Sequence, residues 1–585
     1  ESIRWHQGPA HDHGPRAEGE ITRNCVRRLC AISFLFSLAV LPRLDAENLA
    51  ERYLEEYFRT FPTRATEAGR HDFDLALEDL SPERLTKWVK FNRTARAEAN
   101  DLLQRKDLSL DDRLDAEALL AQVERELHEQ STLHRPQRDP LYWSGIVANA
   151  TVFLLVRDDL PLEERQKRAR ARARLLPRLA DQARATFEGA KSSEISAELC
   201  EIAARQLRAS STFYKQGFPE AAGGNAEDTA EALAKLAEFF EQLARKATGS
   251  PRLGSAYAAT FRVGTGIDEP VENVLARAVV DLVAKKREAA EYGRQVWPEL
   301  LPEETPPRED SALLRRLFER VAADRDSNVD EYFATWQAHV REVEAFVREK
   351  RIITLPDPLT LIVDRSPAFF VGQSVGGVYP SGPYAPEAKT ILFLPMPPPD
   401  ANEAQRDAFF RDFNRSFNRM IVPHELIPGH YVQLKFAARD PHKIRAVFPD
   451  PIYVEGWGTF CERLLLDEGW GGALPRLAHL KKQLENIARC IVDIRVHTEE
   501  MSREEVIRFV KEDALQDDQF ARNMWTRTIT SSPQITTYYL GYTKVRQVYD
   551  AARAKAGEEF ELQKFMDGMM ELGPVRLEHY LARVR

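Results

Sequence analysis

The sequence has few cysteines, five among 585 residues, and no two of them form a Cys-x-x-Cys motif. Two of the five, Cys25 and Cys30, lie close to the N-terminus. The remaining three are odd in number and widely spaced, which excludes a disulfide framework. We expect Cys200, Cys461 and Cys490 to be buried free thiols, with a Cys461–Cys490 pair as the alternative.

The chain also lacks an excess of basic residues. Lys and Arg total 82 against 91 Asp and Glu, which gives a formal net charge of -9. Proteins that bind nucleic acid usually present a basic face, so this balance argues against a nucleic-acid partner. The hydrophobic fraction of 43% is sufficient for a packed core.

Long apolar runs are missing as well, with one exception near the N-terminus. Arg27 and Arg28 precede an apolar run over 29–41, and Ala46 offers a small residue at a cleavage site. This layout is typical of a secretory signal peptide, and the run is short for a membrane span. A buried helix or a short anchor is the alternative. We expect residues 1–46 to be an N-terminal extension with a signal peptide, and the mature protein to be periplasmic or secreted, without a membrane segment.

Helical patterns cover most of the mature chain. Ser81 followed by Pro82 predicts a helix that runs to about Leu103, because Ser is a favoured N-cap and Pro fits the first turn. The stretch over 353–400 is rich in Pro and Gly and holds β-like runs over 360–363 and 390–394. We therefore expect a mainly α-helical protein, with a helical region over 47–350 and a second region over 351–585 that contains a small sheet.

One segment holds the residue types that metal-assisted hydrolysis needs, His-Glu-Leu-Ile-Pro-Gly-His over 424–430. Two neutral imidazoles can hold Zn²⁺ and leave a position open for water, and Glu425 can take a proton from that water. In a regular helix His430 would lie roughly 120° from the face of His424. We expect Pro428 and Gly429 to let the helix bulge and bring the second imidazole back.

A third ligand is expected downstream, in the segment Glu455-Gly456-Trp457. The sequence predicts one Zn²⁺ per chain on His424, His430 and Glu455, and solvated helix charges are the alternative. Glu462 stands seven residues after Glu455, on the same helical face, and we expect it to orient a ligand imidazole.

Peptide hydrolysis also needs a hydrogen-bond donor to the oxyanion. His497 is the first candidate, because Asp493 stands four residues earlier on the same helical face and can fix its tautomer. Tyr538 is the second candidate, since its hydroxyl can donate. A structural His–Asp pair and a packed tyrosine are the respective alternatives.

Together these residues resemble a bacterial family, the domain-of-unknown-function 885 family of gluzincin-like zinc metallopeptidases. The matching segments are His424 to His430, Glu455-Gly456-Trp457, Asp493 to His497, Tyr538 to Gly541, Phe61-Pro62 and Gly69-x-His71-x-x-Asp74. The resemblance covers about 46–585 and implies a two-lobed, zincin-like fold with a small sheet beside the active-site cleft. The family often has a second His where Tyr431 stands, and Thr-Gly where Ile494-Arg495 stands.

We therefore expect an exported zinc metallopeptidase that acts on oligopeptides, with Glu425 as the base. Two alternatives remain open. One is a zinc hydrolase of a non-peptide amide or ester, and the other is a catalytically inert helical protein that binds a metal.

Overall fold

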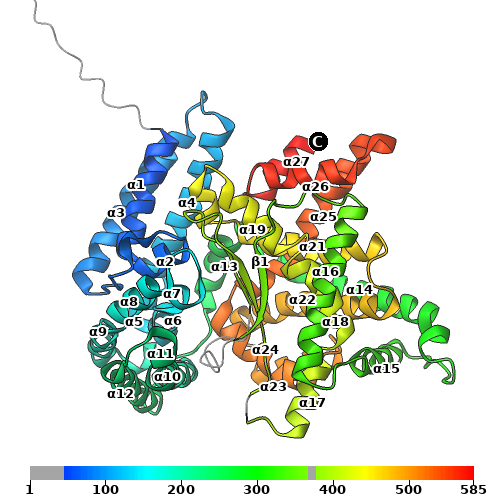
Figure 1. Ribbon diagram of the computed structural model, residues 1–585, viewed down its shortest axis with the longest axis horizontal. Coiled ribbons are helices and arrows are strands. Elements are labelled where there is room, and N and C mark those ends of the chain that lie inside the picture. The colour runs from blue at the N-terminus through cyan, green and yellow to red at the C-terminus, as the bar shows by residue number, and fades with distance from the viewer. Residues whose placement is uncertain (1–44, 367–376, 399, 585) are drawn as a thin grey trace, which may run out of the picture. The chain divides into compact units, whose positions relative to one another are not determined.

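The computed structural model describes residues 45–366, 377–398 and 400–584. The expected signal peptide therefore lies outside the described residues, apart from its last two positions. The described chain is mainly α-helical with one small sheet, which confirms that part of the fold prediction (Figure 1). Among the described residues no single helix is long and apolar enough to cross a membrane, and one bent pair, Leu110–Arg138 with Pro140–Val156, meets the length and composition test jointly.

The described chain from Asp45 to Glu349 consists of helices and their connections. Ser81 accepts a hydrogen bond from the backbone N–H of Arg84, and the helix ends at Leu103, so the predicted helix is confirmed at both ends. The helices of this part are α1 (Ala46–Thr60), α2 (Pro62–Glu67), α3 (Pro82–Leu103), α4 (Leu110–Ser131), α5 (Arg135–Arg138), α6 (Pro140–Asn149), α7 (Val152–Val156), α8 (Leu162–Ala173), α9 (Leu176–Glu188), α10 (Ala197–Thr212), α11 (Phe218–Ala222), α12 (Glu227–Ala244), α13 (Tyr257–Thr265), α14 (Val271–Leu300), α15 (Asp310–Ala323) and α16 (Val329–Glu349).

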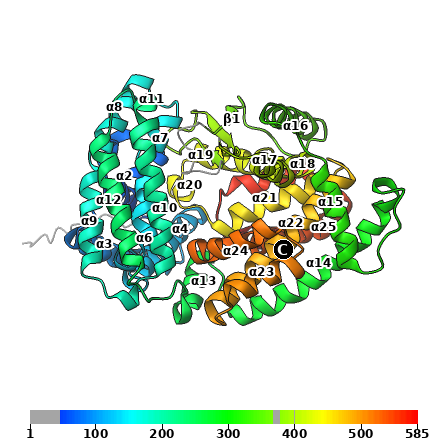
Figure 2. The same cartoon turned by 90° about the horizontal axis from the view of Figure 1, so that it is seen from below.

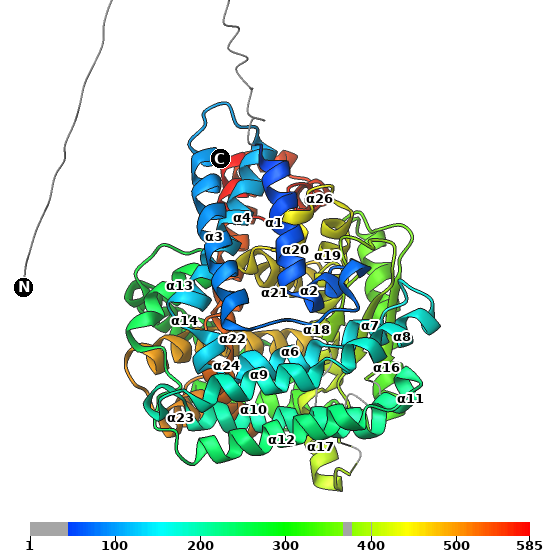
Figure 3. The ribbon, with the colours of Figure 1, turned by 90° about the vertical axis from the view of Figure 1, so that its left-hand side faces the viewer.

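Three strands follow, β1 (Leu361–Arg365), β2 (Gly377–Tyr379) and β3 (Thr390–Leu394), in the order β1-β3-β2. β3 is central, parallel to β1 and antiparallel to β2. Its side chains alternate between two cores, with Ile391 packed toward Val152 and Leu392 toward the C-terminal helices. Helices α1–α12 lie on one side of the sheet and most of the C-terminal helices on the other (Figure 2), whereas the short C-terminal helix α20 (Lys443–Val447) packs against α4 and α1. Helices α10 and α12 run side by side in the first group (Figure 3).

The C-terminal helices pack around the largest hydrophobic core. They are α17 (Glu403–Asp412), α18 (Arg415–Glu425), α19 (His430–Arg439), α20 (Lys443–Val447), α21 (Pro451–Asp467), α22 (Ala473–Thr498), α23 (Arg503–Glu512), α24 (Asp518–Ser531), α25 (Thr537–Ala556), α26 (Leu562–Glu571) and α27 (Leu577–Val584). Helices α21 and α25 cross at Gly456 and Gly541, where a Cβ on Gly456 would lie 2.5 Å from the backbone of Gly541. Glycine at both positions therefore permits the close crossing that brings Glu455 and Tyr538 into one region.

The sheet is fixed to the helix that begins with His430. The hydroxyl of Tyr431 in α19 accepts a hydrogen bond from the backbone N–H of Thr360 at 2.8 Å, just before β1. The buried Lys435 ammonium donates to the carbonyl of Ala388 at 2.9 Å, just before β3. Tyr431 thus has a structural contact at the position where the family often has a second His.

The N-terminal segment Gly69-x-His71-x-x-Asp74 lies near the connection between β2 and β3. Nδ1 of His71 lies 2.7 Å from a carboxylate oxygen of Asp74. Arg157, which is buried, donates to the carbonyl of Pro380 at 2.7 Å. The contact of Arg157 joins the N-terminal helices to the connection that follows β2.

Candidate metal centre

The two histidines of the His-Glu segment lie on either side of a helix break. Helix α18 ends at Glu425 and α19 begins at His430, with a cis Ile427–Pro428 bond in the turn between them. The helix is therefore interrupted between His424 and His430, and the prediction of a bulge within one continuous helix is wrong. A Cβ on Gly429 would lie 1.9 Å from the carbonyl oxygen of His424, so the turn can close only on a glycine. The break brings the two imidazole rings to a centroid distance of 4.7 Å.

Glu455 of α21 faces both imidazoles. Its Oε2 atom lies 3.7 Å from Nε2 of His424 and 3.7 Å from Nε2 of His430. Donor atoms about 2.1 Å from a tetrahedral zinc lie roughly 3.4 Å apart, which is close to this spacing. Oε2 is buried and has no hydrogen-bond partner within the described chain. Because a buried carboxylate oxygen without a partner is costly, the three donors fit a divalent cation bound between them.

The segment around Glu455 also fixes the turn that carries His430. The indole N–H of Trp457 donates to the carbonyl of Pro428 at 3.0 Å. The helix that supplies the third donor is thus hydrogen-bonded to the turn that places the second. This contact accounts for the Trp in the Glu-Gly-Trp motif.

A buried carboxylate orients the first imidazole. Nδ1 of His424 lies 2.7 Å from Oε1 of Glu462, and Nδ1 of His479 lies 3.0 Å from Oε2 of the same carboxylate. With its Nδ1–H donated to Glu462, His424 turns Nε2 toward Glu455. The structure therefore places Glu462 where the sequence predicted it. Sequence reasoning missed His479, whose only local signal is a polar side chain on the inner face of α22.

Protonation of the metal-free centre is governed by these carboxylates. Burial lowers the pKa of His424, but Glu455 and Glu462 outweigh burial and raise it to about 10. Burial raises the pKa of Glu455, and the two imidazoles reverse this and hold it well below its usual range. Burial acts on Glu462 in the same way, and His424 and His479 lower its pKa to about 2. A metal that binds to His424 must therefore displace a proton.

Glu425, the predicted base, is the last residue of α18 and follows His424 directly. Its side chain is half-buried, and its carboxylate makes no hydrogen bond or ion pair with the residues that the structure describes. The carboxylate is therefore free to accept a proton beside the three donors.

Tyr538 lies at the same centre. Its ring centroid is 6.4 Å from that of His424, with the planes inclined by 22°. Gln534 donates from Nε2 to Oε1 of Glu455 at 3.1 Å and to the Tyr538 hydroxyl at 3.3 Å. Burial and the charge of Glu455 raise the pKa of Tyr538 against the opposing effect of Arg489, whose guanidinium lies 4.7 Å from the ring centroid. The hydroxyl thus keeps its proton and can donate it. Sequence reasoning missed Gln534.

His497 makes no such contact. Its Nδ1 accepts a hydrogen bond from the backbone N–H of Leu253 at 3.1 Å, and its Nε2 faces the carbonyl of Thr528 at 3.4 Å. Both ring nitrogens therefore face backbone groups, and burial lowers the pKa of His497 to about 4. None of these contacts involves the three metal donors.

The expected Asp493–His497 pair is not formed. The carboxylate of Asp493 approaches Nε2 of His497 only to 3.9 Å, beyond hydrogen-bond distance. It accepts hydrogen bonds from the hydroxyls of Tyr257 at 2.7 Å and Ser532 at 3.0 Å instead. The tautomer of His497 is thus set by Leu253, and of the two predicted residues only Tyr538 lies beside the His–His–Glu centre.

The fold and the site define a mainly helical protein with a His–His–Glu centre suited to a divalent metal, in which His424 is buried and His430 and Glu455 are half-buried. A model for a family described as "Bacterial protein of unknown function (DUF885)" matches residues 62–584, and the chain belongs to this family. No curated protein matches the sequence at a significant level.

Five solved chains match at a significant level. A "putative lipoprotein of unknown function" from Shewanella oneidensis is 21% identical, with a TM-score of 0.76 over 92% of this chain and 99% of that chain. A "putative lipoprotein" from Colwellia psychrerythraea is 15% identical, with a TM-score of 0.74 over the same shares. These likenesses show a shared fold.

Proposed function

We propose that this protein is an exported, zinc-dependent metallopeptidase of the gluzincin type that hydrolyses oligopeptides. The observation that carries the proposal is the unpartnered Oε2 atom of Glu455, 3.7 Å from Nε2 of both His424 and His430. A purely structural metal site has no need of a base, and Glu425 stands beside this one with its carboxylate uncommitted. The zincin-like, two-lobed architecture is part of the same proposal, with the cleft beside the sheet.

The side chains divide the chemistry as follows. His424, His430 and Glu455 would hold the zinc, which when bound lowers the pKa of a water and polarises a carbonyl. Glu425 takes the proton from the attacking water and passes it to the leaving amine. The Tyr538 hydroxyl donates to the oxyanion, and Gln534 fixes that hydroxyl relative to Glu455.

The sheet offers a place for an extended substrate. Within the described chain, β2 is an edge strand of three residues. Apart from the chain neighbours of Gly377, no described atom lies within 4 Å of the position of a Cβ on this residue. An extended peptide can add to such an edge through main-chain hydrogen bonds. Main-chain hydrogen bonds do not depend on the side chains of the peptide, which suits a peptidase with several substrates.

Export forms part of the proposal because of the signal-like layout over 26–46. The structural neighbours described as putative lipoproteins support the same interpretation. Expression of the chain in a bacterium, followed by cell fractionation and N-terminal sequencing, tests it. We expect a processed protein outside the cytoplasm, and an unprocessed cytoplasmic protein would contradict export.

The test of the activity is hydrolysis of a panel of oligopeptides, esters and non-peptide amides by the zinc-loaded wild type and by Glu425→Gln. We expect peptide turnover in the wild type and a loss of at least ~100-fold in the variant, because general base catalysis contributes this much or more. Turnover of esters or non-peptide amides alone would identify the protein as another zinc hydrolase. Bound zinc without turnover of any compound would favour an inert metal-binding protein.

A further inference from the structure

Three cavities share part of their walls. The largest, of ≈ 750 Å³, is lined in part by Gln534. The side-chain amide of Gln534 donates to Glu455 and to Tyr538, so this residue connects the cavity wall with the candidate metal centre. The other two measure ≈ 560 Å³ and ≈ 430 Å³. Arg125, Phe448 and Pro449 line all three. Arg125 therefore stands where the space beside the metal centre meets the two other cavities.

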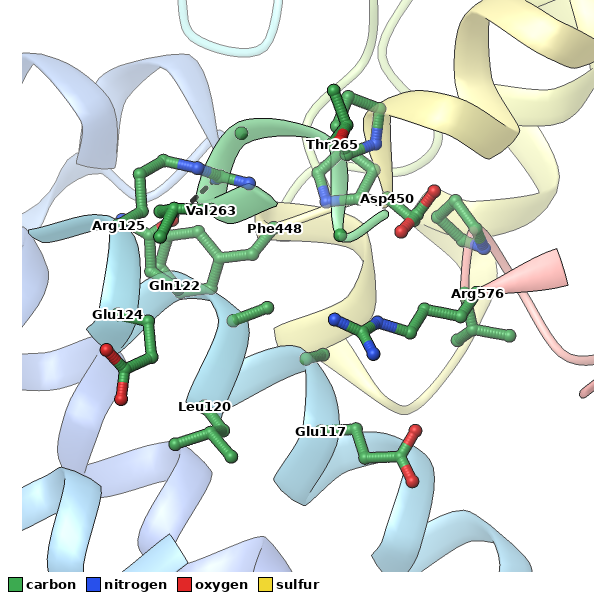
Figure 4. A pocket seen from close by; sticks show the side chains of 18 of the residues that line it. Glu117, Leu120, Gln122, Glu124, Arg125, Val263, Thr265, Phe448, Asp450 and Arg576 are labelled. Atoms are coloured by element: carbon green, nitrogen blue, oxygen red, sulfur yellow. Dashed lines mark hydrogen bonds between the residues drawn. The ribbon is translucent and has the colours of Figure 1, made fainter. Parts of the chain in front are cut away.

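Arg125 belongs to α4 and forms no ion pair with the residues that the structure describes. It donates from one terminal nitrogen to Oε1 of Gln122 at 2.8 Å, and no carboxylate of the described residues lies within 4.0 Å of its nitrogens. In Figure 4 its side chain reaches from α4 toward Val263 at the end of α13. The guanidinium thus keeps donors free at the junction of the cavities.

The other arginines of the largest cavity are already engaged. Their partners are Asp139 for Arg135 at 2.8 Å, Glu194 for Arg138 at 3.1 Å, and the carbonyl of Met501 for Arg252 at 3.2 Å. Arg252 also lies over the ring of Trp525, with 5.3 Å between its guanidinium carbon and the ring centroid. Of the four, Arg125 is the one with neither an acidic nor a backbone carbonyl partner in the described chain.

An uncommitted guanidinium is well matched to a carboxylate, because its donors can form two parallel hydrogen bonds with the two oxygens. The cavity that leads from Gln534 to Arg125 has the volume of a site for a ligand of a few residues. Every unmodified peptide carries one carboxylate at its C-terminal end, whatever its side chains. We propose that Arg125 binds the C-terminal carboxylate of short peptides, so that the protein selects its substrates by that end. This inference rests on the proposed peptidase function.

The test is a competition for binding without turnover. The Glu425→Gln protein, loaded with zinc, is mixed with an equimolar pool of random tetrapeptides as free acids and as C-terminal amides, and the bound fraction is analysed by mass spectrometry. We expect the acids to be enriched by about tenfold or more, since a hydrogen bond to a charged group is worth this factor. In the Glu425→Gln, Arg125→Gln double variant the enrichment should fall to about one.

Two further variants serve as controls in the same background. Arg113→Gln removes the same charge from the same helix at a position outside the three cavity walls, and the enrichment should persist. Arg125→Lys keeps the positive charge but cannot form two parallel hydrogen bonds with a carboxylate, so it should retain part of the enrichment. Circular dichroism and thermal melting show whether each variant is folded.

Four results would overturn the inference. These are equal binding of acids and amides, binding of neither form, enrichment that survives Arg125→Gln, and enrichment that follows Asp or Glu within the peptides in place of the terminal carboxylate. Failure of the proposed function is a separate result, because it appears as zinc-loaded wild type that hydrolyses no peptide, whatever the binding assay shows.

Discussion

Replacement of Glu462 by Gln tests how much the metal centre depends on the carboxylate behind it. Glu462 is fully buried and lies 2.7 Å from Nδ1 of His424 and 3.0 Å from Nδ1 of His479. The Gln amide keeps the size of the side chain but removes the charge that holds the Nδ1–H of His424 and makes Nε2 a stronger donor to a metal.

The expected loss follows from two independent magnitudes. A hydrogen bond to a charged group contributes ~1.5–3 kcal/mol, and the loss of a carboxylate behind a metal-binding His costs about 10–100-fold in affinity. A factor of 10–100 corresponds to about 1.4–2.7 kcal/mol, so the two estimates agree. We expect the Kd for zinc, corrected for the proton that leaves His424, to rise by about 10–100-fold in Glu462→Gln.

The assay is competition with a chelator of known zinc affinity over a series of pH values, which separates the affinity of the deprotonated site from the cost of removing the His424 proton. The matched control is Glu468→Gln, which makes the same chemical change just beyond the end of α21 and should leave the Kd unchanged. His479→Gln should weaken zinc binding less than Glu462→Gln, because His479 touches the carboxylate and not the metal donors. A Glu462→Gln protein that binds zinc within twofold of the wild type would refute the assigned role.

Three other changes have defined outcomes. Gly429→Ala places a methyl group 1.9 Å from the carbonyl oxygen of His424, so we expect loss of zinc binding and a lower Tm. An unchanged Tm with full zinc content would contradict the role of Gly429 in the helix break. Tyr538→Phe should lower kcat by about 100-fold with the zinc content unchanged, because it removes one hydrogen-bond donor to the oxyanion. A kcat within twofold of the wild type would exclude that role. Zinc affinity should rise by about tenfold per pH unit below pH 10, because a proton must leave His424 as zinc binds. Burial lowers the pKa of His424, but Glu455 and Glu462 raise it to about 10 in the metal-free protein. A zinc affinity that does not change over pH 6–9, measured by calorimetry, would refute this linkage.

Local signals allowed much of the fold to be predicted from the sequence. The Ser81–Pro82 pair indicated the start of α3, which begins at Pro82. The β-like runs over 360–363 and 390–394 became β1 and β3, with β1 shifted by one residue at its start. Cys200, Cys461 and Cys490 are buried free thiols, as the scattered spacing indicated.

The centre itself was predictable where its members carry chemical signatures, and unpredictable where contacts join distant segments. His424, His430 and Glu455 follow from their types and order, but Pro428-Gly429 is compatible with both a bulged and a broken helix. Only the packed turn, where Gly429 touches the carbonyl of His424, decides for the break.

Contacts across the chain explain the residues that sequence reasoning missed or misplaced. Gln534 meets Glu455 across 79 residues, and no local pattern marks that meeting. The four-residue spacing of Asp493 and His497 correctly predicts a shared helical face. It does not reveal that Leu253, 244 residues away, occupies the Nδ1 atom of His497.

The most direct test of the metal centre is the zinc content of four proteins after loading and dialysis: the wild type and the variants His424→Ala, Glu455→Gln and His497→Ala. The account predicts about one zinc per chain in the wild type and in His497→Ala, because the contacts of His497 lie outside the donor set. It predicts little or no zinc in His424→Ala and Glu455→Gln, each of which removes one of three donors. Zinc retained in both donor variants, or absent from the folded wild type, would contradict the assignment.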